Sequence, residues 1–260
     1  MQNTEPLILR EDKNGISNLI LNRPKARNAL SLELIELMIR EIKDINENND
    51  IKVVILSGRG PAFCSGHDLK ELKSLNNSEF TKKVFEKCSE MMIEIIKLRI
   101  PVVAKVDGIA TAAGCQLVAT CDLAIASKES IFATPGVNIG LFCSTPSVAL
   151  SRVVPRKKSL EMLLTGENIT AESAVQFGLI NSMVEKNSLD CEVEKLANII
   201  AKKPKRVIEI GKKAFYEQLE KPISQSYEYA SEVMTKNMLE NDCIEGISAF
   251  VEKRKPNWDL

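Results

Sequence analysis

Three short apolar runs constrain the fold of this chain more than any other feature. They are VVILSG (residues 53–58), VVAKV (102–106) and LAIAS (123–127), and stretches with helical spacing lie between them. A short, continuous apolar run is typical of a strand that is buried on both faces of a sheet. Alternation of such strands with helices predicts an α/β fold with mostly parallel pairing and right-handed crossovers.

Further elements are predicted on both sides of these runs. LILRED and ISNLILN flank the turn signal Asn14-Gly15, which predicts a β-hairpin. Ser31 is placed to cap a helix whose apolar residues recur at helical spacing. A long helix is expected over about residues 79–98, because Pro101 would stop it.

Beyond Pro155 the strand signals fade to one weak run, LINSMV, and helical patterns take over. Candidate helix caps in this part are Thr170, Ser224 and Asp242. We therefore predict an α/β core over residues 1–200 and a helical region over residues 201–260. No low-complexity linker separates the two, which favours one cooperative unit.

Composition excludes several classes of function. The 35 basic and 35 acidic residues cancel, so we expect neither a nucleic-acid nor a membrane partner. A single histidine, His67, rules out a zinc motif with two histidines, and no metal site is predicted. A catalytic triad would have to use His67 with Ser65 and Asp68, which lie too close in sequence to converge on one imidazole.

Cysteine usage and the first residues bear on the compartment. The 7 cysteines are an odd number without a C-x-x-C pair, which favours reduced thiols used as small apolar side chains. The start of the sequence, MQNTEPLILRED, has no apolar leader segment and carries early acids. No apolar run approaches the ~20 residues that a membrane span needs. These features predict a cytoplasmic protein.

Two loops are candidates for a functional site. Residues 65–67 (SGH) lead into a helix that Asp68 would cap, with Glu71 placed for a capping box. Residues 111–114 (TAAG) follow the second apolar run and lead into the helix that carries Gln116. The first amides of a helix lack intrahelical partners, so one amide from each loop could bind a carbonyl oxygen. The alternative is that the small residues only permit close helix–strand packing.

Five motifs resemble one known family in order and spacing. They are NRPKARNAL, AFCSGHDLKEL, IPVVAKVDGIATAAGCQLVATCDLAIAS, FATPGVNIGL and GISAFVEKRKPNW, and the match spans about residues 7–258. The chain resembles the enoyl-CoA hydratase/isomerase (crotonase) superfamily. The resemblance implies the crotonase (ClpP-like) spiral of repeated ββα units with a C-terminal trimerisation region. It also implies a homotrimer or dimer of trimers, and an acyl-CoA thioester as substrate or ligand, with no separate cofactor.

The resemblance also implies roles for individual residues. The backbone amides of His67 and Ala113 would donate to the thioester oxygen, although the family usually has glycine where this chain has Ala113. Lys25 and Lys70 would lie near the CoA phosphates, and Phe250 and Lys253 would close over the nucleotide from this chain or a neighbouring subunit. The full set of implied binding residues is Lys25, Ser65, Gly66, His67, Asp68, Lys70, Ala113, Phe250 and Lys253. Without the resemblance, the three lysines would be interpreted as solvated surface residues.

The resemblance fails at the catalytic acids. Hydration in this family uses two glutamates, and alignment places Gln116 at the first position and Gly136 at the second. Glutamine can orient a water but cannot take its proton, and glycine offers only its backbone. The His67 imidazole is an alternative acid or base, and Cys143 an alternative thiol, although a buried structural thiol is the simpler interpretation.

Three hypotheses therefore stand. The first is a hydratase-like lyase of fatty-acid metabolism with weak or non-standard catalysis, in which Gln116 joins His67 and Ala113 at the reacting centre. The second is a non-catalytic acyl-CoA-binding or regulatory protein. The third is a structural oligomer.

Overall fold

The computed structural model describes residues 5–75 and 77–258, which contain two β-sheets wrapped by helices. The larger sheet has the strand order β1-β2-β3-β5-β7-β10, in which β1 is antiparallel to β2 and all other pairs are parallel. Its strands are β1 (Ile8–Lys13), β2 (Ile16–Leu21), β3 (Val53–Gly58), β5 (Val102–Val106), β7 (Leu123–Ser127) and β10 (Ser182–Val184). The three apolar runs form β3, β5 and β7, so the predicted parallel pairing is confirmed.

The smaller sheet is formed by the short strands that follow these three. It has the order β4-β6-β8-β9, and its strands are β4 (Ala62–Cys64), β6 (Ile109–Thr111), β8 (Ile131–Ala133) and β9 (Ile169–Thr170). Along the chain, β3-β4, β5-β6 and β7-β8 each contribute one strand to each sheet and then lead into helices. This repeated ββα order is the spiral that the family resemblance implies.

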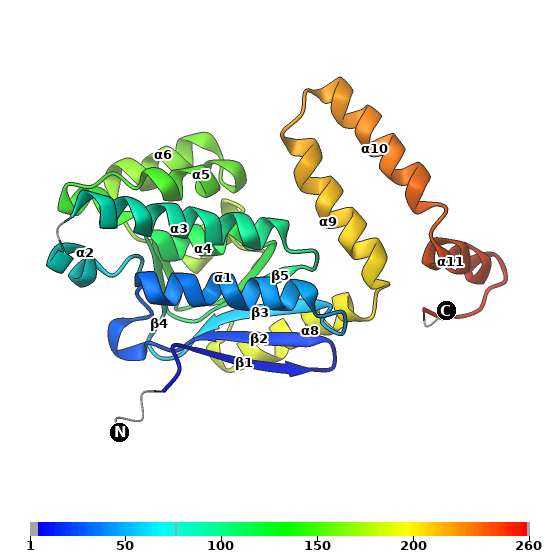
Figure 1. The fold of residues 1–260 in the computed structure, drawn as a ribbon, viewed down its shortest axis with the longest axis horizontal. Coiled ribbons are helices and arrows are strands. Elements are labelled where there is room, and N and C mark those ends of the chain that lie inside the picture. Colours follow the sequence, from blue (N-terminus) through cyan, green and yellow to red (C-terminus); the bar gives the residue numbers. More distant parts are fainter. Residues whose placement is uncertain (1–4, 76, 259–260) are drawn as a thin grey trace.

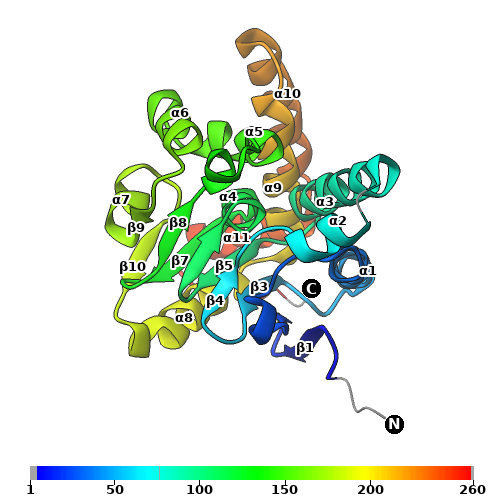
Figure 2. The same cartoon turned by 90° about the vertical axis from the view of Figure 1, so that its left-hand side faces the viewer.

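Helices cover both faces of the larger sheet. In Figure 2, α1 (Leu32–Glu47) and α3 (Ser78–Lys97) lie on one side of the strands, and α8 (Leu189–Ala201) lies on the other. The fully buried α4 (Ala113–Thr120) belongs to the core between α3 and α5 (Ser144–Val153). Other helical elements are η1 (Pro24–Ala26), α2 (Leu69–Leu75), η2 (Pro135–Ile139), α6 (Arg156–Thr165), α7 (Ala171–Gln176) and η3 (Lys186–Ser188).

Local sequence signals explain most of the element boundaries. Asn14 and Gly15 have φ values of 53° and 76°, as a tight hairpin turn requires. The hydroxyls of Ser31 and Thr170 accept amides of the first turns of α1 and α7, as predicted. The other two predicted caps are wrong. Helix α10 begins one residue before Ser224, at Ile223, because Pro222 precedes it, and Asp242 lies in the first turn of α11.

The C-terminal helices extend away from the core (Figure 1). They are α9 (Lys205–Leu219), α10 (Ile223–Asn237) and α11 (Asn241–Val251). The predicted boundary between residues 200 and 201 falls in the last turn of α8, which packs on the sheet, shortly before α9 begins. The division into two regions stays a prediction, and residues 1–4 and 259–260 of those regions lie outside the described part.

Helix α9 is attached to the core through a buried lysine. Lys212 Nζ donates to the carbonyl oxygens of Ile95 and Ile100, both at 3.0 Å, and to Asp122 Oδ2 at 2.7 Å. Asp122 also accepts from the Tyr216 hydroxyl at 2.9 Å, and the Lys212 side chain is only 6% exposed. Burial of an ammonium is tolerated here because all of its donors have acceptors.

Candidate functional site

The loop that carries His67 is held by one isolated bridge to the end of another loop. The Leu30 amide donates to the Gly66 carbonyl at 2.8 Å, and the Asp68 amide donates to the Leu30 carbonyl at 3.0 Å. The Gly66 carbonyl and the Asp68 amide both point towards Leu30. In an extended strand the backbone groups of the residue between them point the other way, so the His67 amide points away from Leu30. None of the hydrogen bonds found among residues 5–75 and 77–258 uses this amide as a donor.

The second loop brings another free amide to the same place. Ala113 is the first residue of α4, and within the described residues its N–H has no acceptor. A Cβ placed on Gly66 would lie 3.4 Å from the Ala113 nitrogen, so the two loops are in contact. Figure 2 shows this end of the molecule, with β4, α2 and α4 toward the viewer. Unpartnered amides at or near a helix start can bind a partly negative oxygen, so these two loops are the candidate site.

The contact between the loops depends on one glycine. A Cβ on Gly114 would lie 2.0 Å from the carbonyl oxygen of Cys64, so only glycine permits this approach. The Thr111 hydroxyl donates to the Ser65 carbonyl at 3.2 Å and ties the same two segments together. The small residues of this stretch therefore serve close packing, which is one of the two interpretations of the loops, and this packing does not exclude the other.

Backbone strain lies beside Ala113 and not on it. Ala113 is helical, so an L-residue is accommodated there, whereas Ala112 has φ 52° and ψ −118°. Residues other than glycine rarely adopt such angles, which cost of order 1–3 kcal/mol. The Ala112 Cβ would lie 2.8 Å from a Cβ on Gly66, so this residue is pressed against the His67 loop.

Gln116 is buried and its carbonyl is unsatisfied. The side chain is 5% exposed, and Gln116 Oε1 lacks a hydrogen-bond partner within the part of the chain that the structure describes. Gln116 follows Ala113 by three residues and therefore shares its helix face. Among the described residues, four other buried side-chain atoms are in this state: His67 Nε2, Thr134 Oγ1, Ser17 Oγ and Asn237 Nδ2. An unsatisfied buried polar atom costs about 1–3 kcal/mol, which suits a site that a ligand or water completes.

Position 136 has no room for a side chain. A Cβ on Gly136 would lie 2.1 Å from the Leu141 carbonyl oxygen and 2.7 Å from Cys143 Sγ. The Leu141 amide donates back to the Gly136 carbonyl at 2.9 Å, which fixes this tight loop. The glutamate that the family would place here is therefore excluded by the backbone itself.

The His67 imidazole is poorly suited to proton transfer. Burial lowers the pKa of His67 from 6.5 to about 4, and the ring makes an edge contact with Phe85 at 5.0 Å between centroids. The imidazole is therefore neutral near pH 7. Burial also raises the pKa of the Cys143 thiol, and of the Cys64 and Cys115 thiols to about 12. All three are protonated, in agreement with the interpretation as buried structural thiols.

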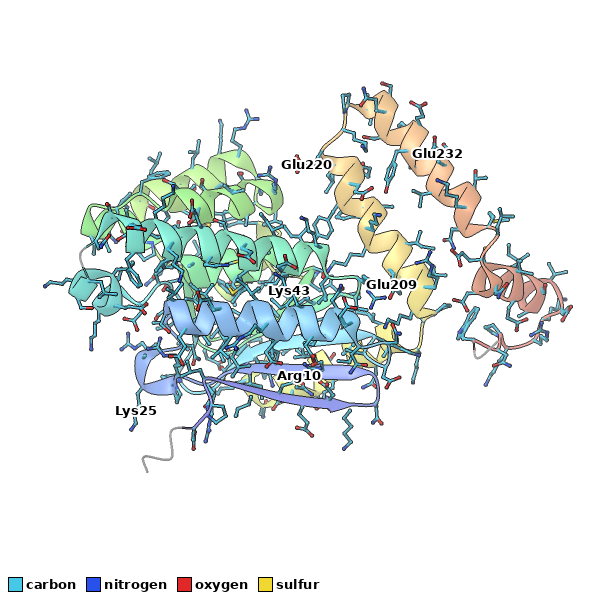
Figure 3. The ribbon with its side chains drawn as sticks, in the orientation of Figure 1. Arg10, Lys25, Lys43, Glu209, Glu220 and Glu232 are labelled. Atoms are coloured by element: carbon cyan, nitrogen blue, oxygen red, sulfur yellow. The ribbon has the colours of Figure 1, made fainter. Side chains whose placement is uncertain are left out.

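The predicted CoA contacts fall into two groups. Lys25 on η1 and Lys70 on α2 are exposed, and within the described residues neither ammonium has an ion-pair partner. Figure 3 shows Lys25 pointing away from the ribbon. Phe250 and Lys253 are in or beside α11, at the end of the molecule opposite α2 (Figure 1), so one chain does not bring them to this site.

Asp68 has structural partners that sequence reasoning missed. Its Oδ1 accepts the Lys70 and Glu71 amides at 3.1 and 3.2 Å, so the predicted cap of α2 is confirmed. Its Oδ2 accepts from Arg23 at 2.9 Å. The other half of the capping box is wrong, because Glu71 Oε2 accepts the amide of Leu32, at the start of α1, at 3.0 Å. The only sequence signal for a role of Arg23 was its place in the NRPKARNAL motif.

A groove runs beside the site on the outer face of α3. It measures about 540 Å³ and is lined by Phe85, Glu86, Ser89, Glu90, Ile93, Glu94, Lys97 and Thr145. Phe85, which contacts the His67 ring, lies at its edge. Phe85 is therefore the lining residue through which the groove borders His67.

Comparison with known proteins identifies the family. The family model described as enoyl-CoA hydratase/isomerase matches residues 11–260. The chain belongs to the enoyl-CoA hydratase/isomerase family. It is 48% identical over 256 residues to enoyl-CoA hydratase domain-containing protein 3, mitochondrial, of Rattus norvegicus, covering 98% of this chain and 85% of that protein. The crotonase fold and family expected from the motifs are confirmed.

Solved structures of this family superpose closely on the chain. A crystal structure of enoyl-CoA hydratase from Mycobacterium smegmatis gives a TM-score of 0.97 at 46% identity, covering 98% of this chain and 100% of that one. The human enoyl coenzyme A hydratase domain-containing protein 3 gives 0.95 at 47% identity, covering 97% and 100%.

The expectation of a cytoplasmic protein is wrong. The relatives from Rattus norvegicus, Mus musculus and Homo sapiens, each 48% identical, are named mitochondrial. Reduced thiols indicate a reducing environment and do not distinguish one reducing compartment from another. Among the helices of residues 5–75 and 77–258, none has both the length and the apolar character to cross a membrane.

Proposed function

We propose that this protein binds acyl-CoA thioesters, with the thioester oxygen accepting hydrogen bonds from the amides of His67 and Ala113. The observation that carries the proposal is the presence of two unpartnered amides on loops in contact with each other. Such amides bind an oxygen more strongly as it becomes anionic. The Lys25 and Lys70 ammonium groups would then contact the CoA phosphates, as in the family.

Hydration of an enoyl group would be slow at this site. A positioned acid or base contributes typically about 10²–10⁴ in rate, and both family acids are absent. Gln116 can hold a water through its amide but cannot accept the proton, and the neutral His67 is a weak base. The reaction we assign is therefore hydratase-like thioester chemistry of fatty-acid metabolism with weak proton transfer.

A second candidate is a non-catalytic acyl-CoA-binding protein. The crowding at Gly136 favours it, because a backbone without room for a side chain retains no space for the second acid. The two candidates share the binding site and differ only in turnover.

Calorimetry with two C4 ligands tests the binding site. Butyryl-CoA has the thioester carbonyl, whereas S-butyl-CoA has a methylene in its place and offers the amides no acceptor. We expect tighter binding of butyryl-CoA by about tenfold or more, as expected for hydrogen bonds to a polarised oxygen. Equal affinity for the two ligands would show that the amides do not bind the carbonyl.

A crotonyl-CoA hydration assay separates the two candidates. Slow but measurable hydration that Gln116→Ala abolishes would support the enzyme. Tight binding without any hydration would support the binding protein. Hydration as fast as that of a family hydratase would contradict the argument from the missing acids.

The proposed phosphate contact has a control on the same helix. We expect Lys70→Ala to weaken binding of CoA severalfold, and less so at high salt, because ion pairs at an exposed site are screened. Lys73 is exposed on the same short helix, and Lys73→Ala should leave the affinity unchanged. An equal effect of the two variants would indicate a general charge effect and not a contact.

A further inference from the structure

The His67 amide lies in a short backbone bridge between two loops. Leu30 and His67 form an isolated bridge with one hydrogen bond on each side, and the Ser65 amide adds one further bond, to the Arg27 carbonyl at 3.0 Å. Directly after it comes α2, which has only 7 residues. Side-chain contacts to the residues of this bridge therefore bear on the orientation of the His67 amide.

Arg23 contacts both strands of this bridge. One terminal nitrogen donates to the carbonyl of Ala29, the residue before Leu30, and the other donates to Asp68 Oδ2 at 2.9 Å. The Arg23 and Asp68 side chains are 21% and 15% exposed, so water competes only weakly for the pair. The guanidinium therefore links Ala29, which precedes Leu30, to Asp68, which follows His67.

The position of Arg23 is fixed in turn by Asn28. The Arg23 amide donates to Asn28 Oδ1 at 2.8 Å, and Asn28 Nδ2 donates to the Ala62 carbonyl in β4 at 2.8 Å. Asn28 is completely buried and has φ 55°, a conformation that asparagine tolerates better than most residues. A connected set of side chains thus extends from β4 through Asn28 and Arg23 to Asp68.

We infer that Arg23 is a positioning residue for thioester recognition, acting through Ala29 and Asp68 on the amide of His67. The inference rests on the proposed function. It assigns to Asp68, which the family resemblance places among the CoA contacts, the task of holding the oxygen-binding loop. It also explains why Arg23 and Asp68, 45 residues apart in the chain, meet at this loop.

A variant of Arg23 with the two C4 ligands tests the inference. In Arg23→Met the aliphatic stem is retained and both hydrogen bonds are lost. We expect the preference for butyryl-CoA over S-butyl-CoA to fall at least about fivefold, while the affinity for S-butyl-CoA stays within about twofold of the wild type. Arg59→Met is the matched control, because Arg59 is nearby in space and its side chain is 54% exposed. It should leave both affinities unchanged.

Other results would overturn the inference. An equal loss of affinity for both ligands would indicate a merely structural role, and an unchanged preference would show that the amide does not depend on Arg23. A wild-type protein that already lacks the preference would contradict the proposed function itself. If Arg23→Met does not fold, Arg23→Lys provides the same readout, because a single ammonium cannot reproduce the two bonds that the guanidinium makes to Ala29 and Asp68.

Discussion

Gln116 and Gly136 stand where the family resemblance places two glutamates, and they depart from the family in different ways. Gln116 has the shape of a glutamate, so its helix and its surroundings could accept a carboxyl group. Gly136 has the Leu141 carbonyl where a side chain would begin. The first change removes a proton acceptor, whereas the second also removes the space for one.

Gly136→Ala should therefore destabilise the protein by about 1–3 kcal/mol, because the added methyl overlaps backbone that cannot easily move. Gly211→Ala in α9 is the control. Nothing lies within 4 Å of its Cβ, and alanine in a helix is favoured by about 0.5–1 kcal/mol. Urea unfolding measures both. An unchanged free energy of unfolding in Gly136→Ala would show that the loop can move to accept a methyl group.

For the same reason we expect no gain in hydration activity from Gln116→Glu combined with Gly136→Glu.

The stability of the protein should depend on pH through His67. Folding lowers the pKa of His67 from 6.5 to about 4, so between these values the unfolded chain binds a proton that the folded protein does not. The free energy of unfolding should then fall as the pH drops from about 6.5 towards 4, by on the order of 2 kcal/mol. In His67→Gln this part of the pH dependence should be absent. Thermal unfolding at several pH values compares the two proteins. The same dependence of stability on pH in both would show that His67 does not cause the loss of stability at low pH.

At the scale of elements, α4 is held at both ends. Its first turn packs on Cys64 through Gly114, and Asp122, just beyond its C-terminal end, binds Lys212 and Tyr216 of α9. The helix that provides the Ala113 amide is thus connected directly to the C-terminal helices.

Lys212→Met should cost about 3–5 kcal/mol of stability. The change leaves Asp122, whose side chain is 14% exposed, without its cation and leaves two carbonyls without a donor. Lys213→Met on the next position is the control, since that side chain is 73% exposed and pairs only loosely with Glu217 at 3.7 Å. Urea unfolding should show little change for the control. A cost below about 1 kcal/mol for Lys212→Met would mean that α9 is attached mainly by other contacts.

At the scale of the molecule, the C-terminal helices carry many exposed apolar side chains. One stripe on α10 consists of Ile223, Tyr227 and Met234, which are 75%, 72% and 70% exposed, and Met238, directly after the helix, continues it at 51%. On α11, Phe250 and Val251 are 84% and 72% exposed. Large exposed apolar patches mark interaction surfaces. The family resemblance makes a second and third copy of the chain the expected partners.

Light scattering after size exclusion should give three or six chain masses. Replacing Tyr227 and Met234 by glutamate should shift the mass towards the monomer, because charges would be buried in an apolar contact. Glu232, labelled in Figure 3, follows Ile223 by nine residues of α10, which places it half a turn away from the stripe, and Glu232→Lys should leave the assembly intact. A monomeric wild-type protein would contradict the predicted trimer and leave Phe250 and Lys253 remote from the site.

The sequence by itself determined the strands of the larger sheet, their mostly parallel pairing and the family, and it singled out the two candidate loops. These follow from local patterns, since apolar periodicity and small residues record how each segment is buried. Only the tertiary structure decided that Asp68 binds Arg23, that Glu71 binds the start of α1, and that Gly136 has no room for a side chain. The physical reason is that a side chain's partner depends on packing: Arg23 and Asp68 are 45 residues apart, and Leu32 and Glu71 are 39 apart, so no local spacing encodes their contact.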